Sequence, residues 1–555
     1  MILLLDGGLN LNSPLVIGDT ETAVALNADF RKKGVVRSRD GRASIYTSQG
    51  VDFIGTADGD IYSAGSYIFQ NGVTTGQATT GVTATGTVKL WQVANEVWLV
   101  AAQNNYKVDG SSVTLWGIAA PTVAPTAVAL AGGSMAVGSY YYKYTYARYS
   151  GGTLIHESNP SPVSSVVALS GGNLQVTFTG TASSDGQVTH INVYRTLLNG
   201  ASGSDDFFFD QSITLPTVTA TSSNTDGQLG ALVEVDNDPP PSGVNSIAGP
   251  GAYAVVFVAV GNTVYFSKGN RPESFPSDYY LDVGVPSQTI QALVDWSGLI
   301  FIFTTIEIYF IQGTDADTFY PIRTQSSRGL VAKQAVAGTP LGIAFLAYDG
   351  LYMFNGQSEV KLSGEKVDSI FRGETINDVS PMNKDAASSC WLVYWNGKLM
   401  LGYPTAGNTT PDKVLVFDLE EKKWSIYDYG INLKSAFVDV DGKRLLAGDT
   451  SGTLWQLESG QSDAGTSFTF KVRSKELSSL AAQAPAFMRF NVLNTNRNTI
   501  TARLLSKGTT VRSQSLTDSR EFKRRVIGPS SFDSLQVEFE GTVTGRVEVG
   551  PVELT

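Results

Sequence analysis

Val414-Leu415-Val416-Phe417-Asp418 and Lys423-Trp424-Ser425-Ile426-Tyr427 are two apolar runs separated by a short polar stretch. Runs of this length, rich in β-branched and aromatic residues, predict the two antiparallel strands of one hairpin. The same unit recurs along the chain, with an apolar strand, a two-residue turn and a second apolar strand. The turns that fit it are Asp58-Gly59, Asn95-Glu96, Gly261-Asn262, Ser297-Gly298, Asp349-Gly350, Asn396-Gly397, Asp441-Gly442 and Ser451-Gly452. Most of these dipeptides favour the positive φ that two-residue hairpin turns require.

The spacing of these turns predicts a β-propeller. Successive glycines at positions 298, 350, 397 and 442 are 52, 47 and 45 residues apart, close to the length of a four-stranded blade. The Val414–Tyr427 unit also resembles the kelch arrangement, in which a strand ends in Asp and the next opens with a Trp that packs between blades. We expect six or seven blades. The number stays open because the first and last strands can share one blade, and an unrelated antiparallel meander is the alternative.

Composition agrees with an all-β fold. Of 555 residues, 42% are hydrophobic, 10% aromatic and 16% charged, and 57 are Gly without a collagen period. This mixture is typical of many short strands joined by tight turns and excludes a disordered chain. The length indicates two or three domains.

Proline runs delimit an insertion in the repeat. Pro121 and Pro125 open it and Pro239-Pro240-Pro241 closes it. Inside, tyrosines at 140, 142, 144 and 146 share one face of a predicted strand, and His190–Arg195 and Phe207–Phe209 indicate two more. The segment resembles a fibronectin type III sandwich, and Glu157-Ser158-Asn159-Pro160-Ser161-Pro162 resembles a strand-ending loop of such modules.

The last segment predicts a small β-sandwich. Apolar residues alternate at 468, 470 and 472, at 488, 490 and 492, and again at 537, 539, 547 and 549. The predicted domains are therefore 1–120 (an N-terminal segment and the first blades), 121–242 (the inserted sandwich), 243–460 (the remaining blades) and 461–555 (a basic C-terminal sandwich).

Charge is distributed unevenly. The whole chain carries −11, but residues 471–526 contain twelve Lys or Arg against three acids, so this stretch carries +9 and the rest −20. A chain of this net charge is not expected to clamp phosphate backbones over its whole surface.

Few residues are available for catalysis. His156 and His190 are the only histidines and Cys390 the only cysteine, which excludes most zinc, Cys-His and Ser-His-Asp chemistry. His156 and His190 are interpreted as surface or strand-edge residues without a role. The composition still allows catalysis by carboxylates alone.

Three Asp-rich stretches are candidates for metal or sugar sites. Asp439-Val440-Asp441-Gly442 and Asp58-Gly59-Asp60 are incomplete calcium loops and are interpreted as hairpin turns, with a single structural cation left open. Asp449–Trp455 superficially resembles the Asp-box of sialidases, but its Asp-to-Gly spacing is one residue too long, so we expect it to close a blade. No catalytic, cofactor-binding or metal-binding residue is assigned, and we expect a protein that is not an enzyme.

Basic clusters raise the question of nucleic-acid binding. They comprise Arg31-Lys32-Lys33 with Arg37, Arg39 and Arg42, and Lys523-Arg524-Arg525. Base-reading modules interleave basic and aromatic residues on one sheet, and these clusters do not. They are interpreted as a solvated face or a protein docking surface, with nonspecific contact with DNA left open.

Targeting signals are not predicted. The apolar run Met1–Leu5 is stopped by Asp6-Gly7-Gly8, and no stretch approaches eighteen apolar residues, so neither a signal peptide nor a membrane span is expected. The lone cysteine fits assembly in a reducing cytoplasm.

The N-terminus resembles that of tail proteins of short-tailed bacteriophages. Gly7-Gly8-Leu9-Asn10 is followed by an Asn-x-Asp segment at Asn27-Ala28-Asp29 and then by Gly34-Val35-Val36-Arg37 and Arg39-Asp40-Gly41. Similar family patterns are Gly269-Asn270-Arg271-Pro272-Glu273-Ser274-Phe275, Ile308-Tyr309-Phe310-Ile311-Gln312-Gly313, Ala347-Tyr348-Asp349-Gly350-Leu351-Tyr352 and Leu362-Ser363. The match covers about residues 1 to 120 and 242 to 460.

The resemblance implies a tail nozzle (tail tubular) protein of the virion, a structural subunit that forms a ring, expected to be a hexamer. Such a ring lies below the head-to-tail adaptor protein, carries tail fibres or tailspikes, and encloses the channel for genome ejection, with transient nonspecific contact with double-stranded DNA. Assembly is expected in the host cytoplasm. The alternatives are a receptor- or glycan-binding tail adhesin, suggested by the sandwich insert, and a propeller glycoside hydrolase.

Overall fold

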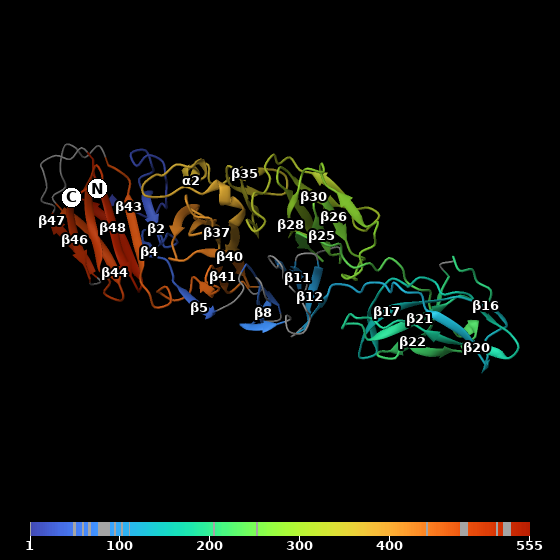
Figure 1. The fold of residues 1–555 in the computed structure, drawn as a ribbon. Helices are drawn as coiled ribbons and strands as arrows, with labels where there is room; N and C mark the ends of the chain where they lie inside the picture. The colour runs from blue at the N-terminus through green and yellow to red at the C-terminus, as the bar shows by residue number, and fades with distance from the viewer. Residues whose placement is uncertain are drawn as a thin grey trace.

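The computed structural model is an elongated molecule of three modules: a β-sandwich at one end, a propeller in the middle and a second sandwich at the far end (Figure 1). Both chain termini lie in the first sandwich. The structure describes residues 2–47, 52–57, 60–64, 68–75, 89–93, 96–101, 104–109, 112–203, 206–250, 254–439, 442–477, 487–517, 520–525 and 534–554.

The described strands form seven four-stranded propeller blades. In chain order, the first four are β6–β9 (Phe53–Ala57, Asp60–Ala64, Ile68–Gln70, Val73–Thr75), β10–β13 (Lys89–Val93, Glu96–Ala101, Asn104–Asp109, Ser112–Leu115), β24–β27 (Ser246–Ala248, Phe257–Val260, Thr263–Phe266, Tyr280–Asp282) and β28–β31 (Ile290–Trp296, Leu299–Thr304, Ile308–Gln312, Tyr320–Arg323). The others are β32–β35 (Val336–Thr339, Gly342–Ala347, Gly350–Phe354, Glu359–Lys361), β36–β39 (Trp391–Trp395, Lys398–Tyr403, Lys413–Asp418, Lys423–Tyr427) and β40–β42 (Leu433–Val438, Leu445–Asp449, Leu454–Leu457) with β5 (Arg42–Tyr46). The predicted propeller is confirmed.

The last blade is completed by a strand from the N-terminal side of the chain. β5 pairs antiparallel with β42, so that Gln456 faces Ala43 and Leu457 faces Arg42. The first strands of the blades contact one another from β10 and β6 through β40, β36, β32 and β28 to β24. Blade β10–β13 meets blade β24–β27 through Lys107 and Glu273, 2.6 Å apart. The expectation that distant strands share one blade is therefore confirmed, and the described strands make up seven blades.

The predicted turns are confirmed in part. Gly261-Asn262, Ser297-Gly298 and Asn396-Gly397 join their strands directly. At Asp349-Gly350 the prediction is wrong by one residue, because Ala347 pairs with Gly350 and the turn is Tyr348-Asp349. Ser451-Gly452 lies in a longer loop between β41 and β42, and Asp58-Gly59, Asn95 and Asp441 lie outside the described residues.

The insertion is a two-sheet sandwich, as the sequence predicts. One sheet has the order β18-β17-β21-β22 (Thr153–Glu157, Tyr142–Ser150, His190–Arg195, Phe208–Thr214), and β20 (Asn173–Thr179) of the other pairs with β14 (Thr126–Leu130), β15 (Gly132–Gly133) and β23 (Thr219–Ser222). β16 (Gly138–Tyr140) pairs with β19 (Val167–Leu169). The four tyrosines 140, 142, 144 and 146 all lie in the core between the sheets. β18 ends at Glu157, and the residues after it, up to Pro162, run alongside β17. The backbone N–H of Ser161 donates to the carbonyl of Tyr144 at 2.8 Å.

The C-terminal sandwich differs from the prediction because it includes strands from the N-terminus. One sheet has the order β2-β43-β48-β45-β46 (Thr22–Leu26, Phe468–Ser474, Gln536–Val543, Ile500–Ser506, Thr509–Leu516), and β2 joins it to β39 of the propeller. The other has the order β3-β4-β49-β44-β47 (Ala28–Asp29, Val36–Ser38, Val547–Leu554, Phe487–Asn494, Arg520–Arg525), with β1 (Ile2–Leu3) on β49. Strands of two to five residues carry too little alternation to be recognised in sequence.

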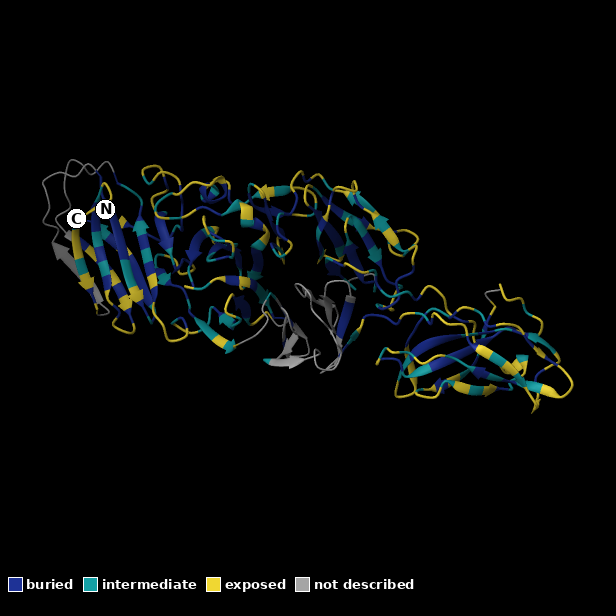
Figure 2. Cartoon of the chain, in the orientation of Figure 1, coloured by how far each residue is buried: buried dark blue, intermediate teal, exposed yellow. Residues whose placement is uncertain are grey.

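Buried residues run along the strands of all three modules (Figure 2). The largest apolar cluster is continuous from the sandwich into the propeller, because Leu9, Phe470 and Phe539 belong to the same core as Leu346 and Trp424. α2 (Asp368–Arg372) is capped by Gly373, and the short 3-10 turns η1 (Asp226–Gln228) and η3 (Lys384–Ser389) complete the described elements. Within the described ranges, no helix is long and apolar enough to cross a membrane.

Replacing Gly41 by Ala should weaken the closing blade. Gly41 immediately precedes β5, and a Cβ there would lie 2.0 Å from the carbonyl oxygen of Ser462. We expect Gly41→Ala to lower the free energy of unfolding by about 1–3 kcal/mol, the usual cost of overpacking a tight site. Urea unfolding measures it. Gly269→Ala is the control, because a Cβ there meets no atom within 4 Å; equal effects of the two changes would contradict the tight closure.

Candidate functional site

Arg39, one of the basic residues weighed for nucleic-acid binding, is buried inside the chain. Its guanidinium binds both carboxylate oxygens of Asp463 at 2.7 and 2.9 Å and lies 4.1 Å from the ring centroids of both Tyr429 and Phe468. Its other three N–H groups donate to the Asn27 side chain and to the carbonyls of Asp40 and Asp428. All five donors are satisfied, and the side chain is not available to DNA.

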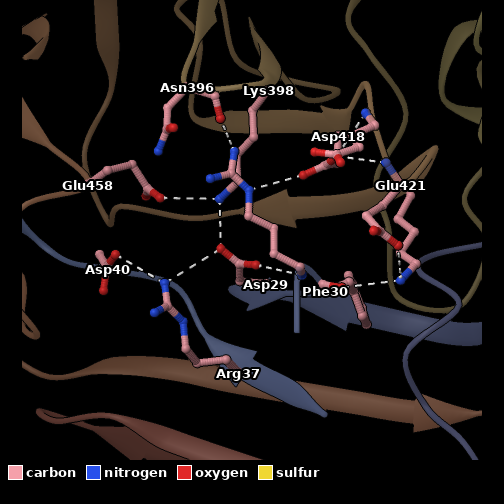
Figure 3. Close-up of polar contacts among 12 residues, drawn as sticks. Asp29, Phe30, Arg37, Asp40, Asn396, Lys398, Asp418, Glu421 and Glu458 are labelled. Atoms are coloured by element: carbon pink, nitrogen blue, oxygen red, sulfur yellow. Dashed lines mark hydrogen bonds and ion pairs between the residues drawn. The ribbon is translucent and has the colours of Figure 1, made fainter. Parts of the chain in front are cut away.

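A second cluster of ion pairs surrounds the buried Lys398 and includes the half-buried Arg37 and the exposed Arg31 (Figure 3). Lys398 of β37 lies 2.8 Å from Asp29 of β3 and 3.5 Å from Glu458, which follows β42. Arg37 lies 3.1 Å from Asp40, and Arg31 lies 3.0 Å from Asp418 at the end of β38. These ion pairs join the N-terminal segment to two blades.

Ionisation in this cluster is set by the pairing. Burial by itself would lower the pKa of Lys398, but Tyr427, Glu458 and Asp29 outweigh burial and raise it. Burial likewise opposes ionisation of Asp29, and the Lys398 charge lowers the pKa of that carboxyl. Lys398 and Asp29 therefore form a charged pair at neutral pH, which acts as a fixed joint between modules, whereas burial raises the pKa of Glu458.

The motif residues of the N-terminus lie in the same joint. At Gly8, where φ is +80°, a Cβ would lie 2.9 Å from the Cβ of Lys423, and the N–H of Leu9 donates to the Trp424 carbonyl at 2.8 Å. Asn27 has a φ of 54° at the point where the chain passes from β2 in one sheet to β3 in the other. Trp424 of the kelch-like unit thus packs against the N-terminal segment as well as the blades.

The C-terminal basic excess is partly neutralised by neighbouring strands. Glu538 of β48 lies 2.7 Å from both Arg473 of β43 and Arg503 of β45. Burial would raise the pKa of Glu538, but these two guanidinium groups lower it. Of Lys523-Arg524-Arg525, the structure places the backbone in β47, and their side chains lie outside the described residues.

Asp439 and Asp449 of the Asp-rich stretches hold the chain that follows them through local hydrogen bonds, whereas Asp58-Gly59 and Val440-Asp441 lie outside the described residues. Asp439 accepts hydrogen bonds from the backbone N–H groups of Lys443 and Arg444 at 2.7 and 3.0 Å. Asp449 ends β41 and accepts from the Ser451 hydroxyl at 2.7 Å and from the Trp455 indole at 2.8 Å. Among the residues that the structure describes, no cluster of three or more His, Cys, Asp or Glu side chains could hold a metal ion.

The lone cysteine and the histidines occupy different environments. Cys390 is buried, and burial raises the pKa of its thiol to about 12. His190 is half-buried on β21 and packs on Tyr149, with 4.5 Å between ring centroids. His156 lies on the edge strand β18, in line with the strand-edge interpretation, but it is not a surface residue. It is buried beside Glu273, Arg148 and Lys107, and its Nε2 has no hydrogen-bond partner among the described residues.

The propeller axis holds a cavity of about 520 Å³. Asp295 of β28 and Lys333 are its two charged residues among the described lining, which is otherwise apolar, small or neutral. Burial raises the pKa of Asp295. Glycoside hydrolysis generally uses two carboxylates about 5 to 10 Å apart, and the described residues supply one here.

A larger groove, of about 640 Å³, lies between the inserted sandwich and blade β24–β27. Glu273, from the Gly269–Phe275 motif, joins the two modules: its Oε1 lies 2.6 Å from Lys107 of β12 and 2.5 Å from Arg148 of β17. The N–H of Gly117 donates to its Oε2 at 3.3 Å. The sequence motif gives no sign of the role of Glu273, because its partners Lys107 and Arg148 lie 166 and 125 positions away.

The charges at this joint are strongly coupled. Burial would raise the pKa of Glu273, but the Arg148 hydrogen bonds and the Lys107 charge outweigh it and lower the pKa to about 2. Burial is the main cause that lowers the pKa of His156 to about 4. An ionised Glu273 cannot serve as a general acid near neutral pH.

Comparisons with known proteins add distant similarities. No family model and no curated protein matches the chain. Among solved structures, an exo-β-1,3-galactanase from Phanerochaete chrysosporium is 9% identical, with 55% of this chain and 95% of that chain covered and a TM-score of 0.21. The dihydro-heme d1 dehydrogenase NirN is 11% identical, with 69% and 75% covered and a TM-score of 0.28. At these values neither protein's substrate or cofactor transfers to this chain.

Removing the Arg39 side chain should destabilise the junction strongly. Arg39→Ala leaves the buried Asp463 carboxylate without its guanidinium, a loss that typically costs about 3–5 kcal/mol. Urea unfolding measures it. Arg372→Ala is the control, because Arg372 is exposed and its pairs with Asp368 and Glu374 should contribute about 0–1 kcal/mol. If both changes lower the free energy of unfolding by less than about 1 kcal/mol, Arg39 does not hold the junction.

Acid should weaken the protein through His156. The unfolded His156 takes up a proton near pH 6.5, whereas the folded one does so only near pH 4, so stability falls as pH drops through that window. Glu273 adds a further loss between about pH 4.5 and 2, because its pKa is lowered in the folded state. Urea unfolding against pH should show a shallower slope between pH 6.5 and 4 for His156→Gln. His190→Gln should keep the original slope; the same slope in all three proteins would refute the assignment.

Proposed function

We propose that this chain is a structural subunit of the tail of a short-tailed bacteriophage. Copies would form a ring, expected to have six members, below the head-to-tail adaptor, and the ring would wall the channel through which genomic DNA leaves. Tail fibres or tailspikes would attach to it, and assembly would take place in the host cytoplasm. The proposal rests on the sequence patterns shared with such tail proteins.

One structural observation carries the proposal: the shared N-terminal patterns build the joint between the modules. Gly8, Asn27, Asp29 and Arg39 hold the N-terminal segment against the propeller or the C-terminal part of the chain. Arg37 lies on β4, where it pairs with Glu548 of the C-terminal strand β49. These side chains bind other parts of the same chain, which is compatible with a structural subunit.

The charge distribution is also compatible with a conduit. Six copies would carry a formal charge of −66, six times the −11 of one chain. Phosphate contacts add affinity and salt dependence, so a channel that lets DNA pass must avoid making many of them at once. The buried Arg39 and the paired Arg37, Arg473 and Arg503 are withdrawn from such contacts.

Ring formation is tested by mass measurement. The purified chain and a co-expressed complex with the head-to-tail adaptor should be compared by light scattering and native mass spectrometry. We expect a six-membered ring with the adaptor, and electron-microscopy class averages of that complex should show an axial channel. A monomer in both preparations would count decisively against the proposal.

A further inference from the structure

We propose that the groove between the inserted sandwich and blade β24–β27 binds an uncharged oligosaccharide. Its floor is the sheet β18-β17-β21-β22, with Glu157, Tyr149, Tyr194 and Phe209 contributed by its four strands. Its opposite wall is the loop that contains Asn270 to Ser274. A volume of about 640 Å³ lies within the range of roughly 300–1,000 Å³ that is usual for small-molecule sites.

The floor presents a fixed acceptor. Oε1 of Glu157 accepts hydrogen bonds from the Thr145 hydroxyl, from Asn192 Nδ2 at 2.9 Å and from the Tyr194 hydroxyl at 2.8 Å. No described residue donates to Oε2, so this oxygen is left for a ligand. Because three neutral donors already hold the carboxylate, a ligand hydroxyl meets an acceptor whose position is set before binding.

A second polar atom at the groove lacks a partner. His156 is 7% exposed and lines the groove, and its Nε2 has no hydrogen bond within the described part of the chain. Buried polar atoms normally have a partner in the protein, in water or in a ligand. A hydroxyl group suits this nitrogen in either tautomer, since it can donate or accept.

The charges around the groove argue for a neutral ligand. Arg148 is paired with Glu273, and Arg271 is paired with Glu234, whose Oε1 lies 2.9 Å from the NH2 group of Arg271. An anionic ligand would approach the unpaired oxygen of Glu157, and a cationic one would approach two arginines whose counterions are already in place. Hydroxyl groups can donate to the free oxygen of Glu157 and can donate to or accept from Nε2 of His156 without adding charge to the groove.

Apolar surface completes the recognition chemistry. The half-buried rings of Tyr149 and Phe209 and the exposed Leu232 lie beside the polar groups. Sugar rings have apolar faces of C–H groups that pack on such side chains, while their hydroxyls reach the surrounding polar atoms. The inference concerns this groove alone and does not depend on whether the chain forms a ring.

The test uses the full-length chain on an array of neutral, uronic-acid-containing and amino-sugar oligosaccharides. We expect retention of neutral oligosaccharides, followed by titration calorimetry with the neutral glycan that is retained most strongly. Retention of no array member, or of acidic or cationic members only, would overturn the proposal.

Two variants place the binding in the groove. Glu157→Gln keeps an oxygen for the three internal donors and turns the ligand-facing acceptor into a donor, so affinity should fall about ten- to hundredfold, the loss expected for one hydrogen bond to a charged group. Leu232→Arg adds bulk and charge at an exposed position and should abolish binding without disturbing the core. Glu374→Gln, on the loop after α2, is the matched control and should leave affinity unchanged. Unchanged affinity in the two groove variants, with melting temperatures as in the unmodified chain, would refute the site.

Discussion

The buried guanidinium of Arg39 is the contact on which the arrangement of the modules depends. It touches the N-terminal segment through Asn27, the propeller through Tyr429 and the carbonyl of Asp428, and the C-terminal part of the chain through Asp463 and Phe468. Burying a charge is expensive unless every donor has a partner, and here all five do. Because five acceptor atoms must meet the five N–H groups of Arg39, the contact fixes how the three segments are arranged.

Closure of the propeller follows from this joint. β5 begins at Arg42, three residues after Arg39, and is the outer strand of the blade formed by β40–β42. The segment that fixes Arg39 therefore also delivers the strand that joins the two ends of the propeller chain. A closed propeller leaves only short, protected strand edges, which limits unwanted strand pairing.

The inserted sandwich is attached by the same physical device. Glu273 is held ionised by Arg148 of the insert and Lys107 of a blade, and at the other joint Asp463 forms an ion pair with Arg39. At both joints a buried carboxylate and its cations come from segments far apart in the sequence. Apolar contacts alone are nondirectional, whereas paired charges fix relative orientation, and this accounts for a groove of defined shape beside Glu273.

The sequence predicts many of the strands, but it does not predict which distant strands pair with one another. The hairpin units, the tyrosine face of the insert and the alternation at 468–472 follow from a period of two, which is a local property. The turn at Tyr348-Asp349 was missed by one residue, because Gly350 is positioned by pairing with Ala347. Of the basic residues at 31–42, Arg31, Lys32 and Lys33 are exposed, as interpreted from sequence, whereas Arg39 is buried. Its burial was not predicted, because a run of charges carries no sign of the acids that it will meet.

Composition, periodicity and turn chemistry by themselves determined that this chain is all-β and built of propeller blades, and the resemblance of residues 121–242 to a fibronectin type III module implied the inserted sandwich. Only the tertiary structure decided that there are seven blades, that β1–β4 belong to the C-terminal sandwich, and that Arg39, Lys398 and Glu273 are joints rather than surface charges. The reason is physical: strand alternation is fixed by neighbours one or two positions away, whereas a buried ion pair is fixed by partners hundreds of positions apart, brought together only when the ring closes.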